Sequence, residues 1–155
     1  MEEQQMWKDK LKKVQEIGRA YSLACVNPGA PKEVISGWAA RVQSTFGVRL
    51  PREWEGILLE ANGFEWNGFI LYGVDRELFD SLPYAVYGLI EQNEIWREPE
   101  GQRAYLFLGE SNISWYVYEA ASGRYMELDN PSGRETAVFR SGGEMLEKLL
   151  DDCLS

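Results

Sequence analysis

Acidic side chains are the residues of this sequence that could do chemistry. Glu65, Glu94 and Glu110 are candidates for a pair of facing carboxylates, one acting as general acid and the other as general base. The chain holds 25 acidic residues, so some pair would look suitable by chance. A carboxylate hydrolase therefore stays an alternative. Residues 129–133, Asp-Asn-Pro-Ser-Gly, could hold a cation, but they are also ordinary hairpin-turn residues.

The sequence lacks the residues on which most other catalytic sites depend. It contains no histidine and two distant cysteines, which excludes Ser-His-Asp and Cys-His catalysis and leaves no thiolate zinc site. It has no phosphate-binding glycine loop, dinucleotide fingerprint or GxSxG elbow. Gly109-Glu110-Ser111 is interpreted as a turn at the end of a strand. We therefore expect a protein that is not an enzyme and binds no cofactor and no metal.

Length and composition predict one domain over residues 1–155, with an N-terminal helix and loop in residues 1–30 and the core in residues 31–155. No apolar run resembles a signal core or approaches the length of a membrane span, which favours a cytoplasmic protein. Cys25 and Cys153 fall on the apolar sides of predicted helices, and we expect both to be buried, reduced thiols.

The formal net charge is −9, and most of it lies in one segment. Residues 55–100 carry ten acidic residues against two arginines, a local charge of −8. Such a field disfavours nucleic acid and anionic membranes as ligands and favours a basic protein partner. Simple solubility is the alternative explanation. The sequence does not determine the oligomeric state.

The elements that must position these residues begin with three predicted helices. The first spans residues 5–25, and residues 27–31 would end it with a stiff loop. The second begins near Pro31 and ends at Gly47. The third begins near Pro51 and is ended by Asn62-Gly63. The expected apolar faces are Trp7, Leu11, Val14, Gly18, Tyr21 and Cys25, then Ile35, Trp38, Val42 and Phe46, then Trp54, Ile57, Leu58 and Ala61.

The rest of the chain predicts mainly strands. Asn67-Gly68 would form a tight turn into a strand over residues 69–72. Residues 74–86 suggest a loop that could hold a short helix, and residues 87–97 a helix. Further strands are expected at 104–108, 114–119, 124–128 and 136–139, followed by a helix that buries Met145, Leu146, Leu149, Leu150 and Cys153. This order predicts an α+β fold in which an antiparallel meander packs with N-terminal helices and a C-terminal helix.

The order of motifs resembles the SUKH superfamily, and within it the bacterial YrhA-like group. The first half of the resemblance is Leu50-Pro51-Arg-Glu-Trp54, Leu58-Leu59-Glu-Ala-Asn62-Gly63 and Asn67-Gly68-Phe-Ile-Leu-Tyr72-Gly73. The second half lies in residues 93–97, 106–111, 115–118 and 125–129, so the similarity runs from about residue 35 to residue 150. The matched family residues, which the resemblance implies are mostly structural, are Trp54, Asn62, Gly63, Gly68, Tyr72 and Gly109.

This resemblance implies a SUKH-like α+β binding domain without enzyme activity. Many bacterial members look like immunity proteins that neutralise toxins, often nucleases, delivered between competing cells in contact-dependent or polymorphic toxin systems. Eukaryotic relatives include yeast regulators of cell-wall synthesis. An intracellular regulatory or scaffold module with no toxin partner is therefore the alternative.

A nuclease active site must attract phosphates and is basic, so an acidic surface could compete for it. Tryptophans between the acids could supply buried contact anchors. The toxin-binding residues predicted on this basis are Glu65, Trp66, Glu91, Glu94, Trp96, Glu98, Glu110 and Trp115. The alternative for each tryptophan is core packing, and for the glutamates a solvated surface.

Overall fold

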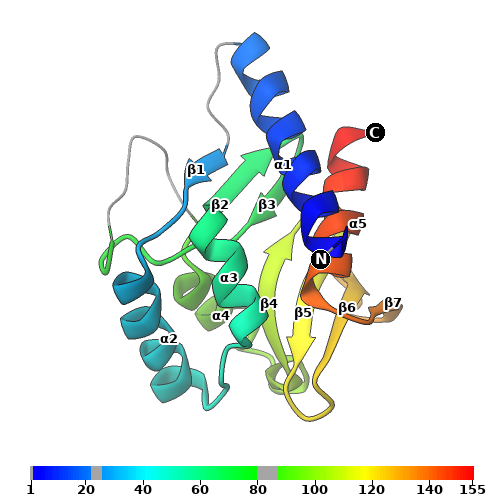
Figure 1. Ribbon diagram of the computed structural model, residues 1–155. Helices are drawn as coiled ribbons and strands as arrows, with labels where there is room; N and C mark the ends of the chain where they lie inside the picture. The colour runs from blue at the N-terminus through cyan, green and yellow to red at the C-terminus, as the bar shows by residue number, and fades with distance from the viewer. Residues whose placement is uncertain (1, 22–25, 80–86) are drawn as a thin grey trace.

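The computed structural model describes residues 2–21, 26–79 and 87–155. Within these ranges, one antiparallel sheet contains seven strands in chain order, flanked by helices (Figure 1). The predicted α+β class is confirmed. The strands are β1 (Val26–Pro28), β2 (Ala61–Trp66), β3 (Phe69–Leu71), β4 (Tyr105–Glu110), β5 (Ser114–Glu119), β6 (Arg124–Asp129) and β7 (Glu135–Phe139). The helices are α1 (Glu2–Ala20), α2 (Lys32–Phe46), α3 (Arg52–Glu60), α4 (Leu89–Trp96) and α5 (Gly142–Leu154), with a 3-10 helix, η1, at Glu100–Ala104.

The two faces of the sheet are covered by different helices. Residues next to each other on a strand point to opposite faces. On one face, Tyr125 of β6 packs against Trp54 of α3, with ring centroids 6.0 Å apart. On the other, Trp115 of β5 packs against Trp96, the last residue of α4, at 5.3 Å. Helices α1, α3 and α5 lie on the Tyr125 face, and α1 runs alongside α5 (Figure 1).

The N-terminal helix is shorter than predicted. Trp7, Leu11 and Val14 are buried as expected. Tyr21, predicted on the same stripe, is 69 % exposed, because α1 ends at Ala20 before the stripe is complete. Cys25 lies outside the described residues.

The stiff loop predicted at residues 27–31 is wrong in its first part. Val26–Pro28 forms the edge strand β1, and Val26 pairs with Phe64 of β2. A proline is tolerated there because an edge strand has one side without sheet partners.

Helix α2 and its end agree with the prediction. Ile35, Trp38 and Val42 are buried, and Phe46 is half-buried against the core. Gly47 ends the helix with a left-handed φ of 70°. Here the local sequence alone determined the geometry.

The predicted role of Asn62-Gly63 as a helix end is wrong. Helix α3 ends at Glu60, and Ala61 is already extended with φ −153°. Asn62 and Gly63 lie inside β2, where the Asn62 side-chain oxygen accepts a hydrogen bond from Val74 N at 2.7 Å. Gly63 has φ +82°, and a Cβ there would lie 2.8 Å from the carbonyl oxygen of Leu71. The pair therefore allows close packing inside the sheet.

Asn67-Gly68 forms the predicted tight turn. Asn67 has φ 53° and Gly68 has φ 80°, as in the type I′ turn that joins two twisted strands. The turn links β2 to β3, with Trp66 paired to Phe69. Strand β2, which precedes the turn, was not predicted.

The second half agrees closely with the prediction. The predicted helix at 87–97 is α4, and the four predicted strands are β4 to β7. Gly109, predicted in a turn, instead lies within β4 at a register shift. A side chain there would meet Ile70 O at 2.7 Å, so close strand packing excludes it. In the predicted 74–86 loop, residues 76–78 form a turn, and 80–86 lie outside the described residues.

The C-terminal helix closes the core. The predicted apolar residues of α5, Cys153 included, are buried. The Ser141 side chain accepts a hydrogen bond from Glu144 N at 3.1 Å, and the Glu53 carboxylate accepts from Gly142 N and Gly143 N. These bonds satisfy backbone donors at the start of the helix and attach α5 to α3.

Candidate binding surface around helix α4

Helix α4 is held at its start by a buried aspartate. The Asp75 carboxylate accepts hydrogen bonds from Trp38 Nε1, Ile90 N and Glu91 N, each at 3.0 Å. Two of these donors belong to the first turn of α4, so the Asp75 side chain caps the N-terminus of this helix. It does so although Asp75 lies thirteen residues before Gly88, the residue at the N-cap position. Gly88 precedes the helix, and a Cβ there would lie 2.2 Å from the carboxylate. These contacts join α2, α4 and the chain after β3.

The middle of α4 is attached to the sheet by Asn93. Its side-chain nitrogen donates to Leu89 O and Phe107 O, and its oxygen accepts from Phe107 N at 2.7 Å. The fully buried amide thus bonds both backbone groups of one β4 residue. The rotation of α4 about its axis is therefore set, and with it the direction of its other side chains.

The end of α4 is connected to strand β4 by a chain of hydrogen bonds. Trp96 Nε1 donates to the Tyr72 hydroxyl at 2.8 Å, and that hydroxyl donates to Glu110 Oε1 at 2.8 Å. Burial, together with the nearby Glu110 charge, raises the pKa of Tyr72 well above its usual value. The hydroxyl therefore stays protonated and keeps both Trp96 and Glu110 in place.

A shallow hollow lies beside the Trp96 ring. Its volume is about 590 Å³. It is lined by Ile95, Trp96, Glu98 and Pro99 at the end of α4, by Gln102 of η1, and by Trp115, Asn130 and Pro131. We call it the tryptophan hollow. Trp115 forms part of its wall and packs edge-on against Phe107, with ring centroids 5.5 Å apart. The lining is mainly apolar, with one carboxylate, that of Glu98.

Of the five predicted glutamates, Glu98 lines the hollow, whereas Glu94 lines a different cavity on α4. Glu91, Glu94 and Glu98 are exposed on or just after α4. Glu65 and Glu110 lie on the sheet, where each is directly opposite Ile70 of β3, so the three share one face. Within the described part of the chain, none of the five glutamates forms an ion pair with a Lys or Arg. We call these five glutamates, with Ile95, Trp96 and Pro99, the α4 surface.

The three predicted tryptophans occupy different environments. Trp96 is half-buried beside the hollow. Trp115 is only 3 % exposed because Trp96 packs against it, so it offers only a small part of its ring, in the wall of the hollow. Trp66 points to the opposite face of the sheet from Glu65, and its ring lies 6.1 Å from that of Tyr21. The structure therefore does not bring Trp66 to the α4 surface.

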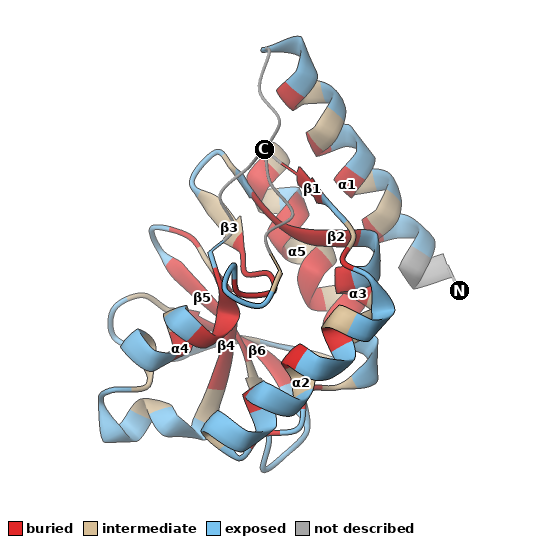
Figure 2. Cartoon of the chain, turned by 90° about the vertical axis from the view of Figure 1, so that its left-hand side faces the viewer, coloured by how far each residue is buried: buried red, intermediate tan, exposed pale blue. Residues whose placement is uncertain are grey.

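Several apolar residues of this region were missed from the sequence. Ile95 is 51 % exposed and Ile113 is 71 % exposed, and the Ile113 carbonyl accepts from Asn130 N at the hollow. Figure 2 shows α4 exposed along its outer side. The position of Ile95 between Glu91, Glu94 and Glu98 on the helix is the sequence signal that it faces solvent.

A second cavity near α4 differs in charge. It has a volume of about 570 Å³ and contains Glu94 and Glu98 but also Arg97 and Arg103. The Arg97 guanidinium lies 4.7 Å from the centre of the Phe46 ring, and burial, with the Arg103 charge, lowers its pKa. The lining of this cavity holds two glutamates and two arginines, whereas that of the tryptophan hollow holds one charged group, the Glu98 carboxylate, which belongs to both cavities.

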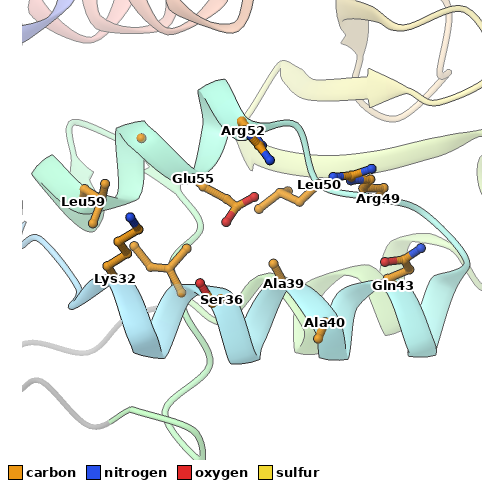
Figure 3. A pocket seen from close by; sticks show the side chains of 12 residues that line it. Lys32, Ser36, Ala39, Ala40, Gln43, Arg49, Leu50, Arg52, Glu55 and Leu59 are labelled. Atoms are coloured by element: carbon orange, nitrogen blue, oxygen red, sulfur yellow. The ribbon is translucent and has the colours of Figure 1, made fainter.

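A groove between α2 and α3 has a volume of about 600 Å³ (Figure 3). Figure 3 shows the Glu55 carboxylate pointing into the space between the helices. Lys32 lies toward one end, and Arg49 and Arg52 toward the other. Leu50, Ala39 and Leu59 supply apolar lining. No residue lines both this groove and the tryptophan hollow.

The family-motif residues of the sequence are mainly in the interior. Trp54, Asn62, Tyr72 and Gly109 are buried, as is Gly63, whereas Gly68 is exposed in its turn. Tyr72 is the one that touches the candidate surface, through Trp96 and Glu110.

Residues 129–133, considered for a cation site, lie where β6 turns toward β7. Asp129 Oδ2 accepts from the Ser132 hydroxyl and backbone N–H, which lowers the Asp129 pKa and fits a hairpin turn. Among the described residues, no group of three or more Cys, Asp or Glu side chains could hold a metal ion. In the same part of the chain, no helix combines the length and apolar character needed to cross a membrane.

The sequence matches no model of a known protein family and no curated protein.

Proposed function

We propose that this chain is a non-enzymatic, cytoplasmic binding protein, an immunity protein of the SUKH type that neutralises a basic toxin domain by direct contact. One observation carries the proposal. An apolar hollow beside a fixed tryptophan is bordered by the exposed Glu98, and the exposed Glu91 and Glu94 lie on the same helix. None of these three glutamates forms an ion pair with described residues. Interfaces that bind proteins typically combine such an apolar centre with a charged rim.

The charge of the surface fits a nuclease-type toxin. An active site that binds phosphates needs lysines and arginines, and glutamates can occupy the positions of those phosphates. Long-range attraction between the two surfaces would also speed association. No turnover is required, because covering the active site is enough to inhibit it.

Growth rescue would test the proposal. The chain is co-expressed with the toxin domain whose gene adjoins its own, and the two proteins are then purified together. We expect restored growth and a stable complex. Growth rescue without any complex would contradict neutralisation by binding.

The acidic residues are tested by changing Glu65, Glu91, Glu94, Glu98 and Glu110 to Gln together. We expect loss of rescue, and slower association that depends less on salt. The control variant changes Asp9 to Asn and Glu16 and Glu33 to Gln, all exposed on α1 or α2. Rescue that survives the five-residue change would contradict the role of charge.

A second candidate function is an intracellular regulatory or scaffold module. The α2–α3 groove favours it, because Lys32, Arg49 and Arg52 there suit an acidic segment rather than a basic toxin. A neighbouring gene without any toxin, and partner binding lost on changing Arg49 and Arg52 to Gln, would support this module instead.

A further inference from the structure

The geometry points to a specific occupant of the tryptophan hollow: an arginine side chain projecting from the partner. This inference rests on the proposed function, because it takes the partner to be a basic protein. It adds the chemical identity of the group that the hollow receives. It also names Trp96 and Glu98 as the residues that select it.

The shape and lining of the hollow suit a long side chain with an apolar stem. Its volume of about 590 Å³ exceeds what one side chain needs, and it is open to solvent on the outside. Ile95, Pro99 and Pro131 offer apolar surface to methylene groups. An arginine can bury its stem against such surface while its charged end stays near the rim.

The charge of the hollow requires a cation at that end. Glu98 is exposed and supplies the one carboxylate of the described lining, which includes no lysine or arginine. Glu110 lies close by, joined to Trp96 through the Tyr72 hydroxyl. A bound anion would meet two negative charges, whereas a cation would be attracted by both.

Trp96 favours arginine over lysine. The guanidinium group is planar and weakly hydrated, so it stacks on an indole ring at a smaller desolvation cost than an ammonium group. The ring is already fixed by its hydrogen bond to Tyr72 and by its packing on Trp115. Little side-chain entropy is therefore lost when the arginine binds.

The ligand chemistry can be tested without the toxin. The full chain, labelled with ¹⁵N, is titrated with the peptide acetyl-Gly-Arg-Gly-amide, and the indole N–H signals of its tryptophans are followed by NMR. The controls are the same peptide with lysine and with citrulline, the uncharged isostere of arginine. We expect the Trp96 and Trp115 signals to shift while those of Trp7, Trp38 and Trp54 do not. We also expect affinity at least tenfold weaker for citrulline and weaker for lysine.

Variants then connect the hollow to the partner. Affinity for the adjacently encoded toxin domain is measured for Trp96→Ala, Glu98→Gln and the control Glu16→Gln, which lies on α1 at the opposite face of the sheet. We expect a loss of at least tenfold for Trp96→Ala, about threefold to tenfold for Glu98→Gln, and none for Glu16→Gln. Trp96→Phe, which keeps an aromatic face, should retain most of the affinity.

The outcomes separate this inference from the proposed function. If the toxin binds tightly and neither Trp96→Ala nor Glu98→Gln weakens it, the arginine site is wrong and the proposed function stands. If the toxin does not bind but the arginine peptide shifts the two indoles selectively, the proposed function is wrong and the ligand chemistry stands. Equal shifts with the citrulline peptide would overturn the arginine site.

Discussion

Asp75 is the residue whose replacement tests the structure most directly. It is 5 % exposed, and its carboxylate accepts from Trp38 Nε1 and Ile90 N on Oδ1 and from Glu91 N on Oδ2. Asp75→Ala removes the acceptor for all three donors. Asp75→Asn keeps an oxygen for the first two but turns an amide N–H₂ toward Glu91 N.

The expected cost follows from these contacts. A buried donor left without an acceptor costs roughly 1–3 kcal/mol, and such costs are not fully additive in one cluster. We expect Asp75→Ala to lower the free energy of unfolding by about 3–5 kcal/mol. Asp75→Asn, which disturbs one donor and removes a charge at the helix start, should cost about 2 kcal/mol.

Urea unfolding followed by tryptophan fluorescence measures both values. With a slope of about 2 kcal/mol per molar, the midpoint should fall by about 2 M for Asp75→Ala and about 1 M for Asp75→Asn. Asp9→Asn, at an exposed aspartate, is the control and should leave the midpoint nearly unchanged. A cost below about 1 kcal/mol for Asp75→Ala, or equal costs for the two variants, would refute the reasoning.

Three further predictions concern other contacts. Gly63→Ala should destabilise the fold by about 2 kcal/mol or more, because the residue has φ +82° and a Cβ has little space there. Gly37→Ala, in an open part of α2, should instead stabilise the fold by about 0.5–1 kcal/mol. Urea unfolding of both variants measures these changes. Tyr72→Phe should cost about 1–2 kcal/mol and change the Trp96 indole N–H signal in NMR, because that N–H loses its acceptor; an unchanged signal would contradict the hydrogen bond. For Lys10, burial acts to lower the pKa, but hydrogen bonds and charge attraction from Asp151 and Glu147 raise it overall above the ordinary value of 10.5. The stabilisation that protonated Lys10 contributes is therefore complete below pH 10.5 and is lost as the pH rises through the raised pKa. Lys10→Gln should be less stable than the wild type at pH 8 but equally stable at the alkaline end of a pH series of unfolding midpoints.

Local patterns predicted the elements whose geometry depends on near neighbours. Gly47 ends α2 and Asn67-Gly68 forms a hairpin turn because positive φ is cheap for these residues in any context. Strands β5 and β6 were predicted almost to the residue, because turn residues border two short runs rich in aromatic and other apolar residues.

The errors share one cause, which is that long-range contacts outweighed local preference. Asn62-Gly63 is a residue pair typical of a helix end, yet it lies in β2. There Asn62 accepts a hydrogen bond from Val74 N, and the Leu71 carbonyl oxygen lies close to Gly63. Val26–Pro28 has the composition of a loop but pairs with β2. Gly109 has the composition of a turn but permits β3 and β4 to approach closely.

The candidate surface likewise combines features that the sequence determines with features that depend on the tertiary structure. By itself, the sequence determined that the chain is acidic, lacks histidine and carries its charge excess in residues 55–100. Tertiary structure decided which of those acids lie together, that Trp115 is covered while Trp96 borders a hollow, and that Trp66 faces elsewhere. The reason is physical: composition sets the total charge, but only the strand register and the anchoring of α4 by Asp75 and Asn93 set the direction of each side chain.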